Sequence, residues 1–205
     1  MRAILRFIRP IRVPNALGLC RAAAFMAVMA GNPASADDIH VAPVIKFFNA
    51  NVRNWLSNPL IITSLKNQNA TTVRLTKPEI DAMDTEWRNE IDSAAHPMID
   101  KVMSTPLSHF LLDKENQADG AITEIIVMDA RGCNAGQSSV STDYWQGDED
   151  KYMKSFMAGP AAIFVDAVRM DESTQMLQSQ VSMTIVDEHN QPIGAITVGI
   201  NLDQL

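Results

Sequence analysis

Residues Met176–Ile200, MLQSQVSMTIVDEHNQPIGAITVGI, contain two strand-like runs joined by a polar turn. In the first run, Met176–Val186, Gln, Ser and Thr alternate with apolar residues, which is the period of a strand with one buried and one wet face. The second run, Ile193–Asn201, is largely apolar, and Glu188–Pro192 supplies the turn between the two. This stretch predicts an antiparallel hairpin that closes a sheet.

Three more runs with strand character precede this hairpin. They are Ile122–Met128, Ala135–Val140 and Ala162–Met170. Turn-forming residues follow the first and third runs, at Asp129–Gly132 and Asp171–Ser173, and Gly159-Pro160 interrupts the chain before the third. We therefore expect an antiparallel sheet of five to six strands.

The chain from residue 41 to 112 has a helical period instead. Apolar residues three and four positions apart mark one face of a long helix: Val44, Ile45, Phe48, Val52, Trp55 and Leu56. Four helix-start signals follow, namely Asn58-Pro59, the capping box Thr76–Glu79, His96-Pro97 and Thr105-Pro106. Helices followed by a strand meander predict an α+β fold, with N-terminal helices before one antiparallel sheet.

The first 36 residues have the order of a secretory signal peptide. Five arginines lie among the first 21 residues, and no acidic residue precedes Asp37. The apolar run Ala22–Ala30 is too short to span a bilayer, and the small-residue site Ala34-Ser35-Ala36 follows it. We expect cleavage after Ala36 and a periplasmic or secreted single domain over residues 37–205, with a helical part (37–112) and a sheet part (120–205). The alternative, a buried helix, leaves the charge asymmetry unexplained.

The composition of the expected mature chain excludes several function classes. Once the five early arginines are removed, 12 basic residues face 24 acidic ones, a formal charge of −12. Such a surface repels phosphate backbones and anionic lipids, so we expect no nucleic-acid partner. We also expect no membrane insertion, since no second apolar run approaches 18 residues. Only Cys133 remains, so the apolar core must hold the domain without an internal disulfide.

The sheet half resembles a known sensor module. The resemblance lies in a strand ending in Asp129-x-x-Gly132, a return strand with Gly136, a loop with an aromatic pair before a helix, and the closing strand Pro192–Ile200. This pattern resembles the Cache domain, the extracellular PAS-like sensor of bacterial chemoreceptors and histidine kinases. The resemblance covers residues 41–205, and Thr142–Glu149 is similar to a characteristic stretch of stand-alone secreted Cache-type proteins.

The resemblance implies a sensor that reports through another protein. Receptors of this kind carry a transmembrane helix directly after the last strand, whereas this chain ends at Leu205. A membrane receptor or histidine kinase is therefore the expected partner.

The resemblance also places residues 143–157 over one sheet face, as the cover of a ligand pocket. Tyr144 and Trp145 would then stack on a small organic ligand, and Asp148 would accept a hydrogen bond from its amine. The alternative is an acidic helix start favoured by the helix dipole, with Trp145 anchoring the loop.

Three further charged residues are candidates for ligand binding. Asp166 interrupts an apolar strand, and the resemblance implies that it holds a ligand's amino group; exposure on an edge strand is the alternative. Arg131 and Arg169 would hold a carboxylate, or form surface ion pairs. The expected ligand is an amine or amino-acid-like compound, or a small carboxylate.

Metal binding and catalysis have little support. The histidines His40, His96, His109 and His189 lie far apart in the sequence, and no zinc, calcium, phosphate-loop or nucleophile-elbow motif is present. We expect no cofactor, no metal and no enzymatic activity. Two rival functions stay open: a ligandless periplasmic adaptor module with a filled core, and a hydrolase of unfamiliar type, which would require a cluster of titratable residues.

Overall fold

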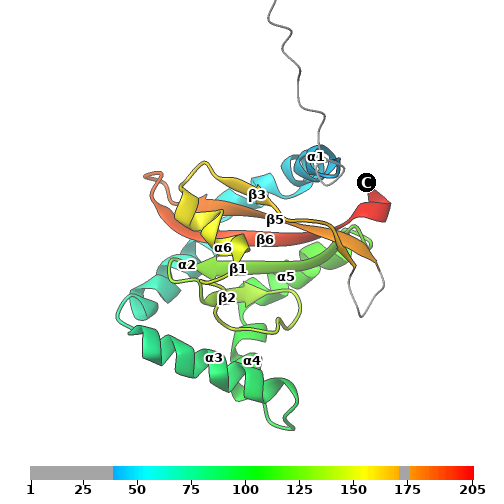
Figure 1. The fold of residues 1–205 in the computed structure, drawn as a ribbon. Helices are drawn as coiled ribbons and strands as arrows, with labels where there is room; N and C mark the ends of the chain where they lie inside the picture. The colour runs from blue at the N-terminus through cyan, green and yellow to red at the C-terminus, as the bar shows by residue number, and fades with distance from the viewer. Residues whose placement is uncertain (1–38, 171–175) are drawn as a thin grey trace, which may run out of the picture. The chain divides into compact units, whose positions relative to one another are not determined.

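The computed structural model describes residues 39–170 and 176–205. The predicted signal peptide and the turn expected at residues 171–173 lie outside the described residues. The helical part comprises α1 (Val41–Asn51), the 3-10 helix η2 (Arg53–Ser57), α2 (Pro59–Thr72), α3 (Lys77–Ile91), α4 (Pro97–Met103) and α5 (Pro106–Gln117) (Figure 1). The sheet part comprises β1 (Ile122–Asp129), β2 (Asn134–Gln137), α6 (Asp150–Met153), η3 (Phe156–Ala158), β3 (Ile163–Val165), β4 (Arg169–Met170), β5 (Leu177–Val186), β6 (Pro192–Asn201) and η4 (Leu202–Gln204).

The strands form one antiparallel sheet in the order β2-β1-β6-β5-β3, and β4 also pairs with β5. The predicted C-terminal hairpin, β5–β6, lies at its centre, with Val181 opposite Val198 and Met183 opposite Ile196. Because the side-chain period of a strand is two, this register places all four side chains on the same face. The α+β fold expected from the sequence is confirmed.

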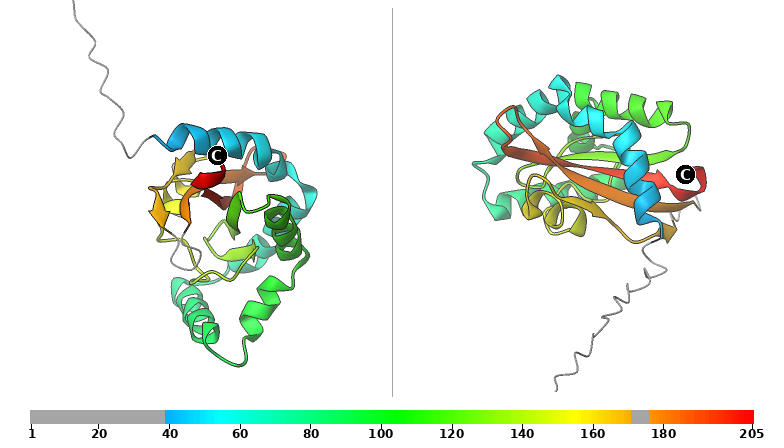
Figure 2. Two further views of the ribbon diagram at one scale, coloured as in Figure 1. Left: turned by 90° about the vertical axis from the view of Figure 1, so that its right-hand side faces the viewer. Right: turned by 90° about the horizontal axis from the view of Figure 1, so that it is seen from above.

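One face of the sheet packs against helices α1, α2 and α5 (Figure 2). Its core holds fully buried side chains from helices and strands alike, among them Val44, Phe48, Leu65, Leu111, Ile125, Val127, Val181, Ile185, Ile196, Val198 and Ile200. Burying a large aliphatic or aromatic side chain stabilises a fold by about 1.5–3 kcal/mol. This face is therefore the main source of stability.

The opposite face is polar and only partly covered. Tyr152 of α6 and Phe156 of η3 pack on Ile126 and Met128, in a smaller cluster that also includes Ala195. Beside this cluster, the hydroxyls of Ser182 and Thr197 lie 2.8 Å apart and both residues are fully buried. The predicted alternation along β5 is correct, but this part of its polar face is buried rather than wet.

Three predicted elements are shorter than their periodicity suggests or are divided. The return strand expected over residues 135–140 is β2, which ends at Gln137. The long helix expected through Leu56 ends at Asn51 and continues as η2, whose end makes the i→i+3 bond from Asn58 N–H to the Trp55 carbonyl (2.8 Å). Asn58 is extended because it precedes a proline. The strand expected over residues 162–170 divides into β3 and β4. Val165 lies opposite Val181 and Arg169 opposite Gln178, so four steps along this strand face three steps along β5, and the extra residue forms a bulge.

Helices α3 and α4 project away from the sheet (Figure 1). The helix α3 begins as predicted, since the Glu79 carboxylate accepts the Thr76 N–H at 2.7 Å, and this bond lowers the pKa of Glu79. At its other end, the buried Glu90 carboxylate accepts the N–H groups of Met98 and Ile99, both at 2.9 Å. Glu90 thus caps α4 and fixes the angle between the two helices. None of the helices in the described part of the chain is long and apolar enough to cross a membrane.

Candidate ligand-binding cleft

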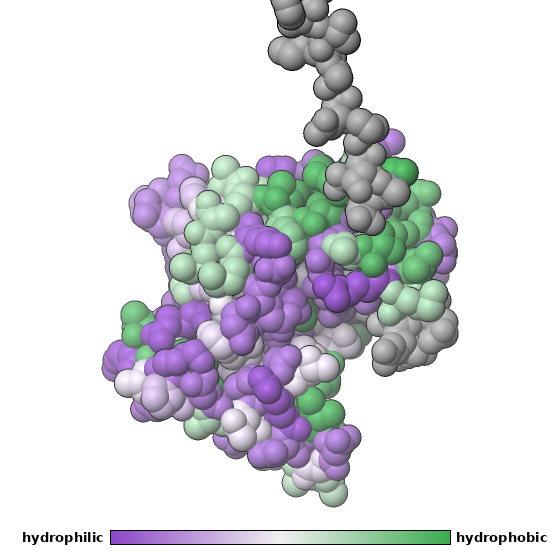
Figure 3. All heavy atoms as spheres, in the orientation of Figure 1, coloured by the Kyte–Doolittle hydropathy of each residue, from purple (hydrophilic) through white to green (hydrophobic). Residues whose placement is uncertain are grey.

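A polar cleft of about 400 Å³ opens on the α6 face of the sheet, where β3 gives way to β4. Its volume is within the range of small-molecule pockets. Figure 3 views this face and shows hydrophilic side chains over α6 and the strands beside it. We call it the polar cleft; its lining residues are Glu149, Asp150, Lys151, Asp166, Ala167, Arg169, Gln178 and Gln180.

The register of the sheet brings its strand residues together. The Asp166 N–H donates to the Gln180 carbonyl at 2.8 Å, and Arg169 lies directly opposite Gln178. Residues opposite one another in an antiparallel pair project to the same side. Asp166, Arg169, Gln178 and Gln180 therefore share one face, although the bulge separates the two pairs.

Hydrogen bonds to neighbouring segments hold the backbone at Asp166 in place. Its carbonyl accepts the Ser179 hydroxyl at 2.7 Å and lies 2.9 Å from Nε2 of His40, just before α1. One carboxylate oxygen of Asp166 also accepts the Ala167 N–H at 2.8 Å. These bonds fix the direction of the Asp166 side chain, which is 21% exposed.

Each side of the polar cleft carries one pair of an acidic and a basic side chain. Asp166 Oδ2 and Arg169 Nε are 3.4 Å apart, and the Arg169 side chain is 72% exposed. From the α6 side, Lys151 Nζ lies 3.0 Å from Glu149 Oε2. Lys151 and Asp166 are 13% and 21% exposed, whereas Glu149 and Arg169 are more exposed. Glu149 and Arg169 are thus the members of the two pairs that a ligand reaches more readily.

Tyr144 and Trp145 lie outside the polar cleft, in a loop that packs against α3. Tyr144 is 5% exposed, and its ring centroid is 5.8 Å from that of Trp87. The Trp145 indole donates to the Arg131 carbonyl at 2.7 Å, and Lys77 Nζ lies 3.8 Å from its ring centroid. Both aromatic side chains hold the loop in place.

This loop is fastened to α3 by a buried carboxylate. Asp84 Oδ1 accepts the N–H groups of Tyr144 and Trp145, both at 2.9 Å. Asp84 also pairs with Arg88, which reaches Asp143 at 2.7 Å, and the two carboxylates raise the pKa of Arg88. Sequence reasoning missed Asp84 because its spacing from the loop gives no local signal.

Arg131 and Asp148 also lie away from the lining of the polar cleft. The Arg131 guanidinium donates to the Leu75 carbonyl at 3.0 Å, in the link between α2 and α3, and to the carbonyl of Thr72, the last residue of α2, at 3.4 Å. Asp148 is exposed, one residue before the cleft-lining Glu149. Of the six predicted ligand-binding residues, the polar cleft therefore unites Asp166 and Arg169. Ligand binding by any of the six stays a prediction.

Two chemical features bear on metal and thiol chemistry. No group of three His, Cys, Asp or Glu side chains within residues 39–170 and 176–205 could hold a metal ion. The buried thiol of Cys133 has a pKa raised to about 12, mainly because burial disfavours the thiolate and then because Asp129 is near. A thiol in this state is a poor nucleophile.

Sequence reasoning also missed the polar cleft's other lining residues. The alternation of Gln178 and Gln180 along β5 gave a usable signal, since it placed both on the polar face. Lys151 gave none, because its side chain enters the polar cleft only through the position of α6.

No protein-family model matches the sequence, and no curated protein matches it. Its fold is similar to three solved domains at low identity. The sensor domain of the Vibrio cholerae histidine kinase DctB is 10% identical over 80% of this chain and 51% of that chain, with a TM-score of 0.43. The ligand-binding domain of the Campylobacter jejuni chemoreceptor Tlp3, in complex with 4-methylisoleucine, is 15% identical over 73% of this chain and 63% of that chain (TM-score 0.37).

The Escherichia coli DcuS sensor domain is 16% identical over 62% of this chain and 89% of that chain (TM-score 0.36). The chain thus spans about half of the DctB domain and less than two thirds of the Tlp3 domain. All three neighbours are sensor or ligand-binding domains. The fold of this chain is α+β, with one antiparallel sheet.

Proposed function

We propose that the protein is a sensor domain that binds a small molecule in the polar cleft and acts outside the cytoplasm. The observation that carries this proposal is the pairing of Asp166 with Arg169 on one sheet face, opposite the charged start of α6. The basic, apolar and small-residue order of the first 36 residues supports the location.

The charges favour a ligand that carries both an amine and a carboxylate. The Asp166 carboxylate, with Glu149 or Asp150 across the polar cleft, would accept hydrogen bonds from an ammonium group. Arg169 and Lys151 would bind a carboxylate. An amino-acid-like compound uses both halves, whereas a simple amine or a small carboxylate uses one.

Recognition is the only chemistry this function requires. A bound ligand would draw the start of α6 toward β4, and it can shift that segment only by its different affinity for the two positions. A membrane receptor or histidine kinase would then respond to the position of α6 and the loop before it.

A thermal-shift screen of the purified protein against amino acids, amines and small carboxylates tests this function. A ligand at a hundred times its Kd stabilises a protein by about 2.7 kcal/mol, which corresponds to several degrees in Tm. Asp166→Asn should abolish the response to amines and Arg169→Gln the response to carboxylates. The matched control, Glu188→Gln, removes an exposed ion pair with Lys66 away from the polar cleft and should leave both responses intact.

A ligandless adaptor module is the second candidate. The packing of Tyr152 and Phe156 onto the sheet favours it, because these side chains fill the space beneath α6 and η3. Absence of any thermal shift in the screen would count for this candidate. A shift that survives both Asp166→Asn and Arg169→Gln would place the ligand elsewhere.

A further inference from the structure

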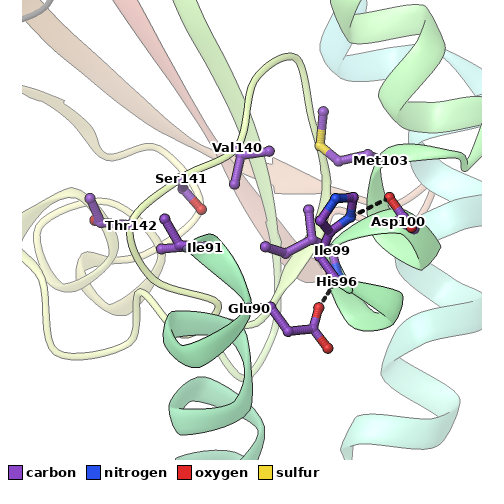
Figure 4. Close-up of a pocket in the computed structure, with 9 residues that line it drawn as sticks. All are labelled: Glu90, Ile91, His96, Ile99, Asp100, Met103, Val140, Ser141 and Thr142. Atoms are coloured by element: carbon purple, nitrogen blue, oxygen red, sulfur yellow. Dashed lines mark hydrogen bonds and ion pairs between the residues drawn. The ribbon is translucent and has the colours of Figure 1, made fainter. Parts of the chain in front are cut away.

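A second hollow lies at the far end of the molecule, between α3, α4 and the loop after β2. The volume of this hollow is about 420 Å³. Figure 4 shows the side chains that line it, which come from all three segments. We call it the tip groove; its apolar lining residues are Ile91, Ile99, Met103 and Val140. Ile91 and Val140 remain 42% and 48% exposed, so two branched apolar side chains face solvent at its mouth. Clustered exposure of this kind marks interaction sites.

The polar groups at the tip groove do not form a small-molecule site. The Glu90 carboxylate is already bonded to the N–H groups of Met98 and Ile99. Asp100 is paired with Nδ1 of His96 at 2.8 Å, on the exposed rim. Apart from the buried Glu90, whose carboxylate is already bonded, the hollow offers apolar contact at its centre and charge at its edge, which is the arrangement of a protein interface.

The charge around the tip groove selects the kind of partner. Glu90 and Asp100 line the tip groove, and residues 77–103, which form α3, α4 and the link between them, carry seven carboxylates against three lysines and arginines. This excess repels anionic lipids and nucleic acids and attracts a basic protein segment.

The tip groove shares one chain segment with the polar cleft. Residues 140–142 form a wall of the tip groove, and residues 149–151 line the polar cleft. Between them, Asp84 and Arg88 fasten residues 143–145 to α3, and the Trp87 indole donates to the Ser141 carbonyl at 2.8 Å. A single stretch of chain, held against α3, therefore connects the polar cleft to the tip groove.

We propose that the tip groove is the docking surface for a partner protein, which inserts an apolar side chain from a basic segment. The apolar residue would fill the space between Ile91 and Val140, while its basic neighbours face the carboxylates of α3 and α4. The partner would dock at the tip groove whether or not a ligand is bound in the polar cleft. Any effect of that ligand on docking rests on the proposed function.

Peptide binding to the purified protein tests this proposal. The probes are a pooled set of eight-residue peptides with Leu, Ile, Phe or Met at the centre and Lys or Arg on both sides. Two matched sets replace the central residue by Ser or the basic residues by Glu. Fluorescence anisotropy should show saturable binding of the first set alone. Val140→Asp and Ile91→Glu should each weaken that binding at least tenfold, whereas Val73→Asp, at another exposed apolar residue, should not.

Equal binding of the Ser-centred set would overturn the proposal, because it would reduce the contact to charge alone. Absence of binding by the first set would overturn it as well, and so would affinity that Val140→Asp and Ile91→Glu leave unchanged. Each variant's Tm is measured in parallel, so that loss of fold is recognised. These results do not depend on a ligand, so failure here is distinguishable from failure of the polar-cleft function.

Discussion

The two faces of the sheet are built from neighbouring residues of the same strands, yet they do different work. On β6, Ile196 and Val198 enter the sealed core against the helices, while Thr197 between them meets Ser182 on the other face. On β5, Val181 is fully buried in that core, while Gln180 beside it lines the polar cleft. Stability is concentrated on one face, which leaves the other free to carry charged groups that a core would not tolerate.

The largest difference in unfolding free energy is expected between substitutions at two adjacent residues of β6, which face opposite sides of the sheet. Ile196→Ala should lower the free energy of unfolding by about 4 kcal/mol, because it removes buried methyl groups and leaves a cavity. Thr197→Ala should cost less, about 1–3 kcal/mol, because it leaves the buried hydroxyl of Ser182 without its partner. Urea unfolding followed by circular dichroism measures both. Equal costs would mean that the two faces share the stability.

The next test concerns the loop that joins the polar cleft to α3. Asp84→Ala should lower the free energy of unfolding by about 2–3 kcal/mol, because two backbone N–H groups lose their buried acceptor. Trp87 and Trp145 lie beside this site, so tryptophan fluorescence should change in the folded state. Asp81→Ala, which removes an exposed partner of Lys77 on the same helix, is the control and should be nearly neutral.

Burial of Cys133 predicts that the free energy of unfolding depends on pH. With a folded-state pKa near 12, the thiol keeps its proton above pH 8.5, where the unfolded chain loses it. The thiol's contribution to stability should then fall as pH rises, by about 1.4 kcal/mol per pH unit. The difference in unfolding free energy between the protein and Cys133→Ala, measured from pH 7 to 10, isolates this contribution.

The same pKa sets the reactivity of the thiol. At pH 8, labelling by iodoacetamide should be on the order of a thousandfold slower in the folded protein than in the unfolded chain. Fast labelling of the folded protein would show that the loop opens readily.

The smallest expected effect is on the open face. Arg169→Gln should change the free energy of unfolding by less than about 0.5 kcal/mol, since Arg169 is mostly exposed and its pair with Asp166 is weak. Thermal unfolding without ligand measures this. A loss above about 1 kcal/mol would indicate that the charged pair supports the fold rather than a ligand.

Much of the fold could be predicted because its signals are local. Three helices begin directly after a capping residue and have a proline in their first two positions. The capping residues are Asn58, Thr76 and Thr105. The strands of the closing hairpin likewise begin within one residue of their predicted starts. Caps and alternation act over a few residues, so they can be read without knowing what lies across the fold.

The candidate site was less predictable because its members meet through tertiary contacts. Asp166 and Arg169 were identified as an unusual charge in an apolar strand and a nearby cation, but their meeting with Lys151 depends on where α6 lies. Tyr144 and Trp145 were predicted to stack on a ligand, and nothing in their local sequence reveals that α3 supplies Trp87 and Lys77 to pack against them.

By itself, the sequence determined the order of helices and strands, the antiparallel closing hairpin and the acidic character of the chain. These follow from short-range periodicity and composition. Only the tertiary structure decided which polar face stays open, which aromatic residues serve the packing, and where an apolar groove forms between α3 and α4. Those outcomes depend on the burial of each side chain by segments distant in sequence, which no local pattern encodes.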